Sequence, residues 1–211
     1  MKMTVSLMIV MVLVTASFAV LGQKKVKELH LSKVLPVSAQ EVWKVVAEDY
    51  GGVAYSHPKI IASDYINGSL KGEEGAERVC YFNDSQTQYL KERMVDFSPA
   101  EMSFTNQVFQ AGKFPVDPDL TKAVYKVEDA GNGKSRITFD MQYRTKPAFM
   151  GGMMKGSFTK LIEDYFIAIE HHIKTGDKVT KNNFKEIKKL YARRDTTAKN
   201  DRVLALSAVD E

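Results

Sequence analysis

Tyr55, His57 and Pro58 stand together in the stretch VAYSHPKI (residues 53–60), directly ahead of a β-branched run. A histidine here can donate or accept a hydrogen bond, or act as a general acid or base together with Tyr55 and Glu92. No nucleophile–base pair is evident from the spacing, and catalytic groups are recognised by geometry. We therefore assign no catalytic residue, and name Tyr55, His57 and Glu92 as the candidates if the protein is an enzyme. The alternatives are that the stretch forms a pocket wall, or only a turn in which Pro58 ends a helix.

Cys80 is the single cysteine, so an intramolecular disulfide is ruled out. A reactive thiol needs a nearby cation to lower its pKa, and Arg78 is the visible candidate. We favour an unreactive Cys80 that packs as a small hydrophobic side chain. The metal-binding spacings CxxC, HxxxH and HExxH are absent from the sequence, so we expect no metal and no cofactor.

The composition is that of an ordinary globular protein. Of the 211 residues, 44% are hydrophobic and 27% are charged, and the formal net charge is +4. These values are typical of one domain with short additional segments. Because the sequence has no arginine-rich arm and no basic stripe interleaved with aromatic residues, we expect no nucleic-acid partner.

Residues 1–22 differ from the rest of the chain. After Lys2 the run MTVSLMIVMVLVTASFAVLG carries no charge, and it contains the small–x–small sequence SFA at 17–19. A positive residue, an apolar core and small residues near the end are typical of a secretory signal peptide. We expect cleavage after Ala19 or Gly22, and a folded part that is periplasmic or secreted. The alternative is an uncleaved membrane anchor, because an apolar run of about 20 residues can span a bilayer.

The first elements of the folded part are a strand and a helix. Residues 24–35 alternate between apolar and polar side chains as a strand does. Residues 38–52 are then predicted to form a helix, which begins with a capping box between Ser38 and Glu41. From about 59 to 144, short alternating segments are divided by Gly-, Asn- and Pro-rich turns, which predicts an antiparallel meander.

A long helix is predicted to cover the apolar face of that meander. Residues 156–176 repeat apolar side chains at helical spacing, and Gly176 is suited to end the helix. A sheet with one apolar face under one long helix predicts a two-layer α+β domain over residues 23–176. Just ahead of the helix, Met150, Met153 and Met154 flank two glycines, and they suit either a pocket lid or a loosely packed connection.

Residues 177–211 are expected to form a basic extension, partly helical and then disordered beyond about 195. Residues 181–192 can form a short amphipathic helix among lysines and arginines. Its apolar face consists of Phe184, Ile187, Leu190 and Tyr191. Such a helix can contact a membrane surface peripherally. We favour the alternative that it packs on the domain and leaves its basic face in solvent.

Five stretches of the sequence, in this order along the chain, are similar to those of a known superfamily: LSKVLPVSAQEVWKVVAE, YSHPKI, GAERVCYF, YLKERMVDFSP and GNGKSRITFDMQYRTKP. Together with the element order, they resemble the SRPBCC superfamily over roughly residues 25–176. That superfamily includes START lipid-transfer domains, birch-pollen-allergen-like proteins and polyketide cyclase/dehydrase-like proteins. The resemblance implies a helix-grip fold, in which a curved antiparallel sheet wraps around the long C-terminal helix and leaves an apolar cavity. It also implies binding or transport of lipids, sterols, hormones or polyketides, or, in a minority of members, cyclase activity.

The stretch AGKFPVDPDLTKAVY departs from the family pattern. Many relatives carry an Asn-Tyr pair just after the proline, where this chain has Asp-Leu-Thr-Lys. A tyrosine contact with the ligand is therefore not transferred to Leu120 or Thr121.

The resemblance also suggests which residues surround the cavity. If Arg78 points inward, as in the related hormone receptors, strand alternation turns Glu92 inward on the next strand. Because buried charges are costly unless paired, such a pair is satisfied mutually or by a ligand head group. The alternative is that both residues lie near an open end in solvent. The predicted ligand-binding residues are Tyr55, His57, Arg78, Cys80, Phe82, Leu90, Glu92, Met94, Phe104, Tyr125, Phe139, Met141, Phe158, Ile162 and Tyr165.

These observations lead to three hypotheses. The first is an exported binding protein whose partner is a small hydrophobic or amphipathic ligand, such as a lipid, an isoprenoid or an aromatic compound. The second is a cofactor-free cyclase or dehydratase that uses Tyr55, His57 and Glu92. The third is an interaction protein that acts through its basic C-terminal tail. A closed, dry cavity below about 300 Å³ would favour this third hypothesis.

Overall fold

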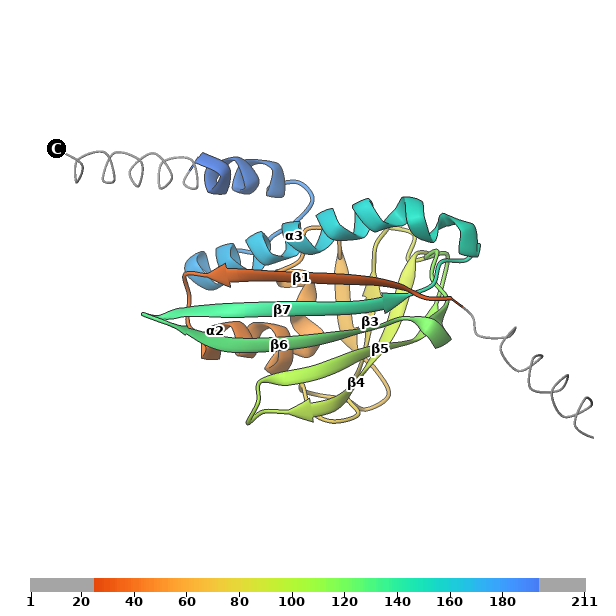
Figure 1. Ribbon diagram of the computed structural model, residues 1–211, viewed down its shortest axis with the longest axis horizontal. Helices are drawn as coiled ribbons and strands as arrows, with labels where there is room; N and C mark the ends of the chain where they lie inside the picture. The colour runs from red at the N-terminus through yellow and green to blue at the C-terminus, as the bar shows by residue number, and fades with distance from the viewer. Residues whose placement is uncertain (1–24, 194–211) are drawn as a thin grey trace, which may run out of the picture.

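The computed structural model describes residues 25–193 as a long helix lying across a curved antiparallel sheet (Figure 1). The strands are β1 (Lys27–Leu35), β2 (Ala62–Tyr65), β3 (Glu77–Tyr81), β4 (Tyr89–Ser98), β5 (Ser103–Ala111), β6 (Lys122–Gly131) and β7 (Lys134–Tyr143). The helices are α2 (Ala39–Trp43), η1 (Lys44–Glu48), η2 (Tyr50–Tyr55), η3 (Pro118–Leu120), η4 (Ala148–Met150) and α3 (Gly151–Thr175). Residues 184–193, the last of the described part of the chain, are also helical.

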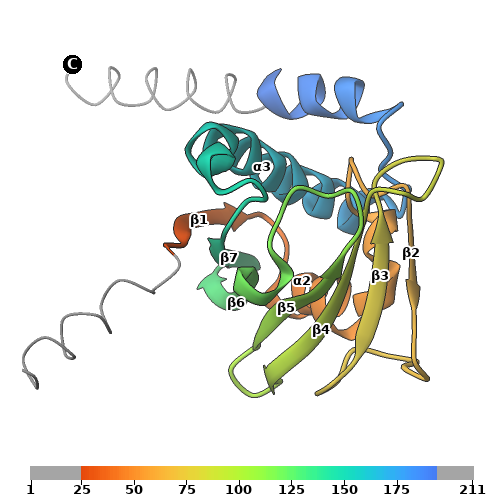
Figure 2. The same cartoon turned by 90° about the vertical axis from the view of Figure 1, so that its right-hand side faces the viewer.

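The seven strands follow the order β1-β7-β6-β5-β4-β3-β2, and each pairs with its neighbours in the antiparallel sense. Seen end-on, the sheet bends into a trough, and α3 lies across its open side (Figure 2). The pairing of β4 with β5 shifts register between Lys91 and Glu92 and again between Val95 and Ser98. Such bulges bend a sheet and increase its twist, which helps to close the trough around the helix.

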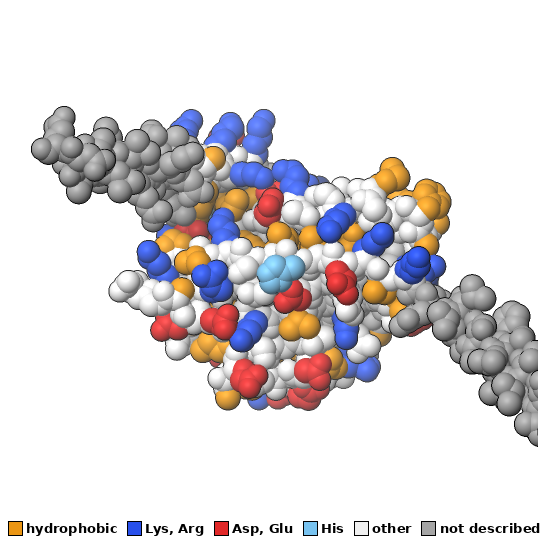
Figure 3. All heavy atoms as spheres, viewed as in Figure 1, with side chains coloured by type: hydrophobic (Ala, Val, Ile, Leu, Met, Phe, Trp, Pro, Cys, Tyr) orange, Lys and Arg blue, Asp and Glu red, His pale blue; other side chains and the backbone are white. Residues whose placement is uncertain are grey.

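Period-two alternation decides which side chains enter the trough. On β6, Ala123, Tyr125 and Val127 are buried while Lys122, Val124 and Lys126 are exposed. The outer face of the sheet carries charged side chains of both signs (Figure 3), as expected of a face that meets water.

The predicted helix at 38–52 begins as expected but is not continuous. Ser38 N donates to Oε2 of Glu41 over 2.9 Å, and Glu41 N donates to Oγ of Ser38 over 3.3 Å, which completes the capping box. The chain then passes from α2 through a π-helical turn, η1, into a 3-10 helix, η2. A Cβ atom at Gly51 would lie 2.4 Å from the ring of Tyr65, so glycine at this position allows β2 to pack closely against η2.

Helix α3 starts at Gly151, earlier than the predicted residue 156, and ends at Thr175, with Gly176 as its C-cap as predicted. Met153 and Met154 therefore lie in its first turn rather than in a connection ahead of it. Gly176 has a φ of 75° and its N–H bonds to His172 O over 2.8 Å, which is a left-handed C-cap that suits glycine.

The segment after α3 returns to pack on it. Val179 N donates to Tyr55 O over 2.8 Å, and Nζ of Lys188 pairs with the buried carboxylate of Asp164. A small core unites Ala168 of α3 with Val179, Phe184, Ile187 and Tyr191. Of the two predicted arrangements, the structure has the packed helix, and positive side chains gather along this edge of the molecule (Figure 3). No helix within residues 25–193 is long and apolar enough to cross a membrane. The predicted signal peptide and the predicted disorder beyond 195 lie outside the described residues.

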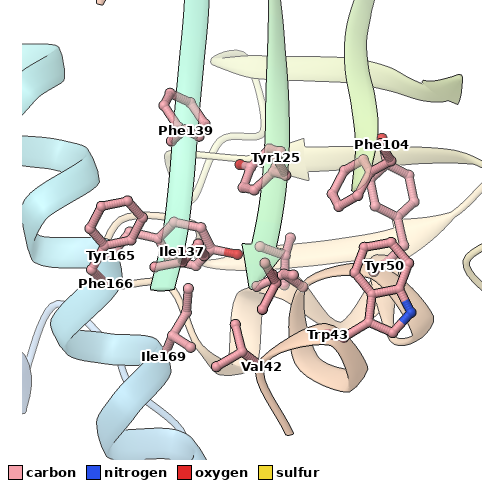
Figure 4. Close-up of a cluster of buried hydrophobic side chains, with 14 of the residues drawn as sticks. Val42, Trp43, Tyr50, Phe104, Tyr125, Ile137, Phe139, Tyr165, Phe166 and Ile169 are labelled. Atoms are coloured by element: carbon pink, nitrogen blue, oxygen red, sulfur yellow. The ribbon is translucent and has the colours of Figure 1, made fainter. Parts of the chain in front are cut away.

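The buried apolar residues form two main clusters rather than one. The larger cluster joins α2 and η2 to the inner face of the sheet and to α3 around Phe104, Tyr125 and Phe166 (Figure 4). The second cluster lies toward the other end of the trough around Leu90, Tyr143 and Phe158. Residues of both clusters line the space that is the candidate site.

Candidate functional site

A cavity of about 90 Å³ lies between α3 and the inner face of the sheet. It is largely apolar. Its apolar lining consists of Val53, Ile60, Phe82, Leu90, Val108, Phe114, Val116, Ala123, Phe139, Met141, Phe158, Leu161 and Ile162. Its other lining residues are His57, Arg78, Glu92, Asn106, Thr121, Lys122, Tyr125 and Tyr165. An apolar chamber with a few polar groups is the usual composition of a ligand pocket, although such pockets commonly measure about 300 Å³ or more.

Arg78 and Glu92 form an ion pair in the cavity wall. They face each other across β3 and β4, with 2.8 Å between Nε of Arg78 and Oε2 of Glu92, and both residues are buried. Arg78 also donates through Nη1 to Tyr50 O over 2.7 Å, and its guanidinium carbon lies 3.9 Å from the centre of the Tyr50 ring. The predicted inward pair is present, and the two charges satisfy each other rather than being solvated at an open end.

Glu92 keeps one carboxylate oxygen free for another partner. Oε2 accepts from Arg78 and lies 3.6 Å from Sγ of Cys80. Oε1 receives no hydrogen bond from any residue in the described part of the chain, and 10% of the Glu92 side chain remains accessible. Glu92 therefore offers the cavity an anionic acceptor whose charge is balanced by Arg78.

His57 is held in one orientation by its own turn. Its Nδ1 accepts hydrogen bonds from the backbone N–H groups of Lys59 and Ile60, both over 3.1 Å. Burial, together with the positive charges of Arg78 and Lys59, lowers the pKa of His57 to about 3. The ring is therefore neutral near pH 7 with its proton on Nε2, since Nδ1 is occupied as an acceptor. Among residues 25–193 nothing accepts from Nε2, so this N–H is a hydrogen-bond donor available to the cavity.

Asn106 is oriented by a tyrosine from the opposite layer. The hydroxyl of Tyr50 donates to Oδ1 of Asn106, which leaves the amide NH₂ of this buried side chain as a donor on the cavity lining. Tyr125 and Tyr165 also line the cavity, and burial raises the pKa of both phenols, that of Tyr165 to about 12. Both hydroxyls therefore remain protonated and neutral.

Most of the predicted ligand-binding residues lie around this cavity. Its lining includes His57, Arg78, Phe82, Leu90, Glu92, Tyr125, Phe139, Met141, Phe158, Ile162 and Tyr165. Whether they contact a ligand stays a prediction. Four other predicted residues do not line it: Tyr55, Cys80, Met94 and Phe104.

The four differ in their surroundings. Cys80, Met94 and Phe104 face inward as alternation predicted, but they are almost completely buried in the filled part of the core. Phe104, for example, lies between Trp43 and Tyr125, and its ring is stacked 4.7 Å from that of Tyr125 (Figure 4). Burial raises the pKa of the Cys80 thiol, which agrees with the expected unreactive cysteine.

Tyr55 lies outside the cavity, at the end of η2. Its side chain is 54% exposed, with its ring 4.8 Å from Nζ of Lys178 and 6.5 Å from the ring of His172. The 3-10 turn carries its backbone toward the C-terminal segment, where Tyr55 O bonds to Val179. The suggested catalytic set of Tyr55, His57 and Glu92 is therefore not brought together at one point.

Several lining residues were missed by the sequence interpretation. Asn106 and Val108 share the inner face of β5 with Phe104, so the alternation of SFTNQVFQA would have found them. Phe114 and Val116 lie in the connection from β5 to η3, where no periodic pattern signals which side chains turn inward.

A second hollow, a surface groove of about 440 Å³, adjoins the cavity. The two share Phe82, Phe114, Phe158 and Leu161 as lining residues, and the rings of Phe82 and Phe114 are 4.6 Å apart. Lys59, Lys160 and Asp164 are among the polar residues on the outer side. Apolar side chains thus separate a small inner chamber from a wider groove in contact with solvent. No group of His, Cys, Asp and Glu residues suited to hold a metal ion occurs within residues 25–193.

Comparisons with known proteins agree with this fold. A family profile described as "Polyketide cyclase / dehydrase and lipid transport" matches residues 27–166. No curated protein matches the chain significantly.

Solved structures share the arrangement of sheet and helix. Ara h 8.0201 is 19% identical with a TM-score of 0.58, and the match covers 72% of this chain and 99% of that chain. A START superfamily protein from Mycobacterium smegmatis is 14% identical with a TM-score of 0.57, and the match covers 70% of this chain and 97% of that chain. The Zhui aromatase/cyclase from Streptomyces sp. R1128 is 12% identical with a TM-score of 0.53, and the match covers 71% of this chain and 92% of that chain. At these identities the likeness concerns the fold, and the predicted helix-grip arrangement is confirmed.

Proposed function

The chain belongs to the family of polyketide cyclases/dehydrases and lipid-transport proteins, within the SRPBCC superfamily, and we propose that it is an exported binding protein for a small amphipathic ligand. The observation that carries the proposal is the combination of an apolar chamber with polar groups that lack a full set of protein partners. Glu92, His57 and Asn106 are buried residues whose side chains line the cavity, and polar groups in such a place are costly to leave without partners unless a ligand or water completes their hydrogen bonds.

The cavity size argues for an opening movement. By volume alone, 90 Å³ is below the usual range of ligand pockets and fits the third hypothesis, a filled core. The cavity differs from a closed, purely apolar one, however, because charged and polar groups line it and a wide groove adjoins it. We infer that a ligand enters from the groove when Phe82 and Phe114 move apart, which joins the two spaces into one elongated site.

Nothing in the arrangement favours the proposed cyclase or dehydratase mechanism over binding. Tyr55 is exposed and does not line the cavity, and His57 has a pKa of about 3, so His57 is a poor general acid or base near pH 7. Export is proposed from the sequence of residues 1–22, which has the charge and size pattern of a signal peptide.

Native mass spectrometry of the protein produced with its own leader would test the binding function. We expect a co-purified small molecule, identified after denaturing extraction, or uptake of one from a lipid extract of the host. Val108→Phe should abolish binding by filling the cavity, whereas Val124→Phe, the same change on the outer face of β6, should leave it intact. An unoccupied mass in the parent protein, with no uptake from the extract, would overturn the proposal.

A further inference from the structure

We infer that the ligand is electrically neutral and carries a hydroxyl group, as an alcohol or phenol does, and that the cavity excludes the carboxylate of the same carbon skeleton. This inference rests on the proposed binding function and adds the chemical class of the ligand. Three features of the described residues support it: the balance of charges on the cavity wall, the hydrogen-bond donors and acceptors that the wall leaves free, and the fixed orientation of the His57 ring.

The charges on the cavity wall cancel. Arg78 carries one positive charge and Glu92 one negative charge, and the two are in direct contact. His57 is neutral, as are the protonated phenols of Tyr125 and Tyr165. A ligand therefore meets no net charge at this end of the cavity.

Lys122 is the other charged residue of the lining, and it is exposed to solvent on β6. Its charge is hydrated and screened there, so it compensates a buried anion weakly. Burying a carboxylate without a dedicated counter-ion is expensive. The free oxygen of Glu92 also repels a second carboxylate, because like charges in one site disfavour ionisation.

The free hydrogen-bonding groups require both a donor and an acceptor from the ligand. His57 Nε2–H and the Asn106 amide are donors, and they need an oxygen lone pair. Glu92 Oε1 is an acceptor and needs an O–H or N–H group. A hydroxyl group provides both functions in one atom, whereas a carboxylate provides acceptors alone and a hydrocarbon provides neither.

The orientation of the donors does not depend on the ligand. Two backbone N–H groups hold Nδ1 of His57, and the Tyr50 hydroxyl holds Oδ1 of Asn106. A site built in this way to bind a hydroxyl group rejects analogues that lack it, because its own buried polar groups are then left unpaired.

Isothermal titration calorimetry with three matched probes tests the inference. Cinnamyl alcohol, cinnamate and β-methylstyrene share one skeleton and differ in the terminal group. At pH 7 we expect the alcohol to bind at least tenfold more tightly than either of the others. Glu92→Gln removes the negative charge and leaves Arg78 unbalanced, so this variant should lose the preference for the alcohol or reverse it in favour of cinnamate.

A second measurement uses the unaltered protein, so it does not depend on the folding of the variant. If the cavity accepts the neutral form alone, the apparent affinity for cinnamate should rise about tenfold for each unit that the pH is lowered from 7 to 5, as the uncharged acid becomes more abundant. Binding of the alcohol should stay constant over this range. Equal or tighter binding of cinnamate at pH 7 would overturn the inference while leaving the carrier function intact. Failure of all three probes would instead count against the binding function itself, and the inference would fall with it.

Discussion

Nε of Arg78 lies 2.8 Å from Oε2 of Glu92, directly across the β3–β4 pair, with both side chains buried beside the cavity. The guanidinium also donates to Tyr50 O, which ties the pair to the first residue of η2, the helical turn that precedes β2. A buried ion pair of this kind is costly to break, because the remaining partner becomes an unpaired charge.

Replacing one member of the pair should therefore destabilise the fold strongly. Arg78→Met should lower the free energy of unfolding by about 3–5 kcal/mol, as measured by urea denaturation. The double variant Arg78→Met/Glu92→Met should recover most of that loss, since apolar side chains of similar size can replace a buried pair. Lys126→Met breaks an exposed pair with Glu128 on β6 and should change stability little. If the double variant is no more stable than the single one, the two charges do not act as a unit.

The pKa of His57 predicts how stability depends on pH. The unfolded chain takes up a proton on this ring below about pH 6.5, whereas burial and the charges of Arg78 and Lys59 delay protonation in the folded state to about pH 3. Between these values the unfolded state binds more protons, so His57 makes the folded state less stable as the pH falls. The slope is at most about 1.4 kcal/mol per pH unit for one proton.

Urea denaturation of the wild type and of His57→Gln between pH 7 and pH 4 would isolate this effect. The variant should lose less stability than the wild type as the pH falls, because it lacks the ring that titrates. Direct observation of the His57 ring by NMR provides the check. An inflection of its chemical shift near pH 6.5 would contradict the account.

Alternation along the strands made much of this site predictable from the sequence. Arg78, Glu92, Tyr125 and Phe139 face the trough because successive side chains of a strand point to opposite faces, whatever the tertiary structure. The same rule cannot say where along the trough the core ends and the cavity begins. Met94 faces inward like its neighbours, yet it is completely buried in the larger cluster around α2 and η2.

Other features depend on local geometry that a single sequence does not reveal. The predicted helix over 38–52 divides into three helical types, and this places Tyr55 at the surface rather than in the pocket wall. Phe114 enters the lining from an irregular connection whose backbone path is set by tertiary contacts. The sequence thus predicted the inner face of the sheet well, and the ends of the cavity poorly.

Cys80 should be unreactive until the protein unfolds. Its side chain is 1% exposed and burial raises the pKa of the thiol, so both access and the thiolate form are suppressed. We expect negligible reaction with the thiol reagent DTNB at pH 8 in buffer, and rapid reaction of this single thiol in denaturing urea. Rapid reaction in buffer would show that the β3–β4 wall opens in the native state.

The separation of cavity and groove predicts a kinetic role for Phe114. Its ring lies 4.6 Å from that of Phe82, and both line the inner cavity and the outer groove. Phe114→Ala should raise the association and dissociation rates of 2-naphthol several-fold while changing its affinity much less, because truncation clears the path without removing the polar contacts. Stopped-flow fluorescence measures both rates. Phe149→Ala is the matched control, since Phe149 is 78% exposed and lines neither hollow. Rates that change equally in both variants, or in neither, would show that ligands do not pass between Phe82 and Phe114.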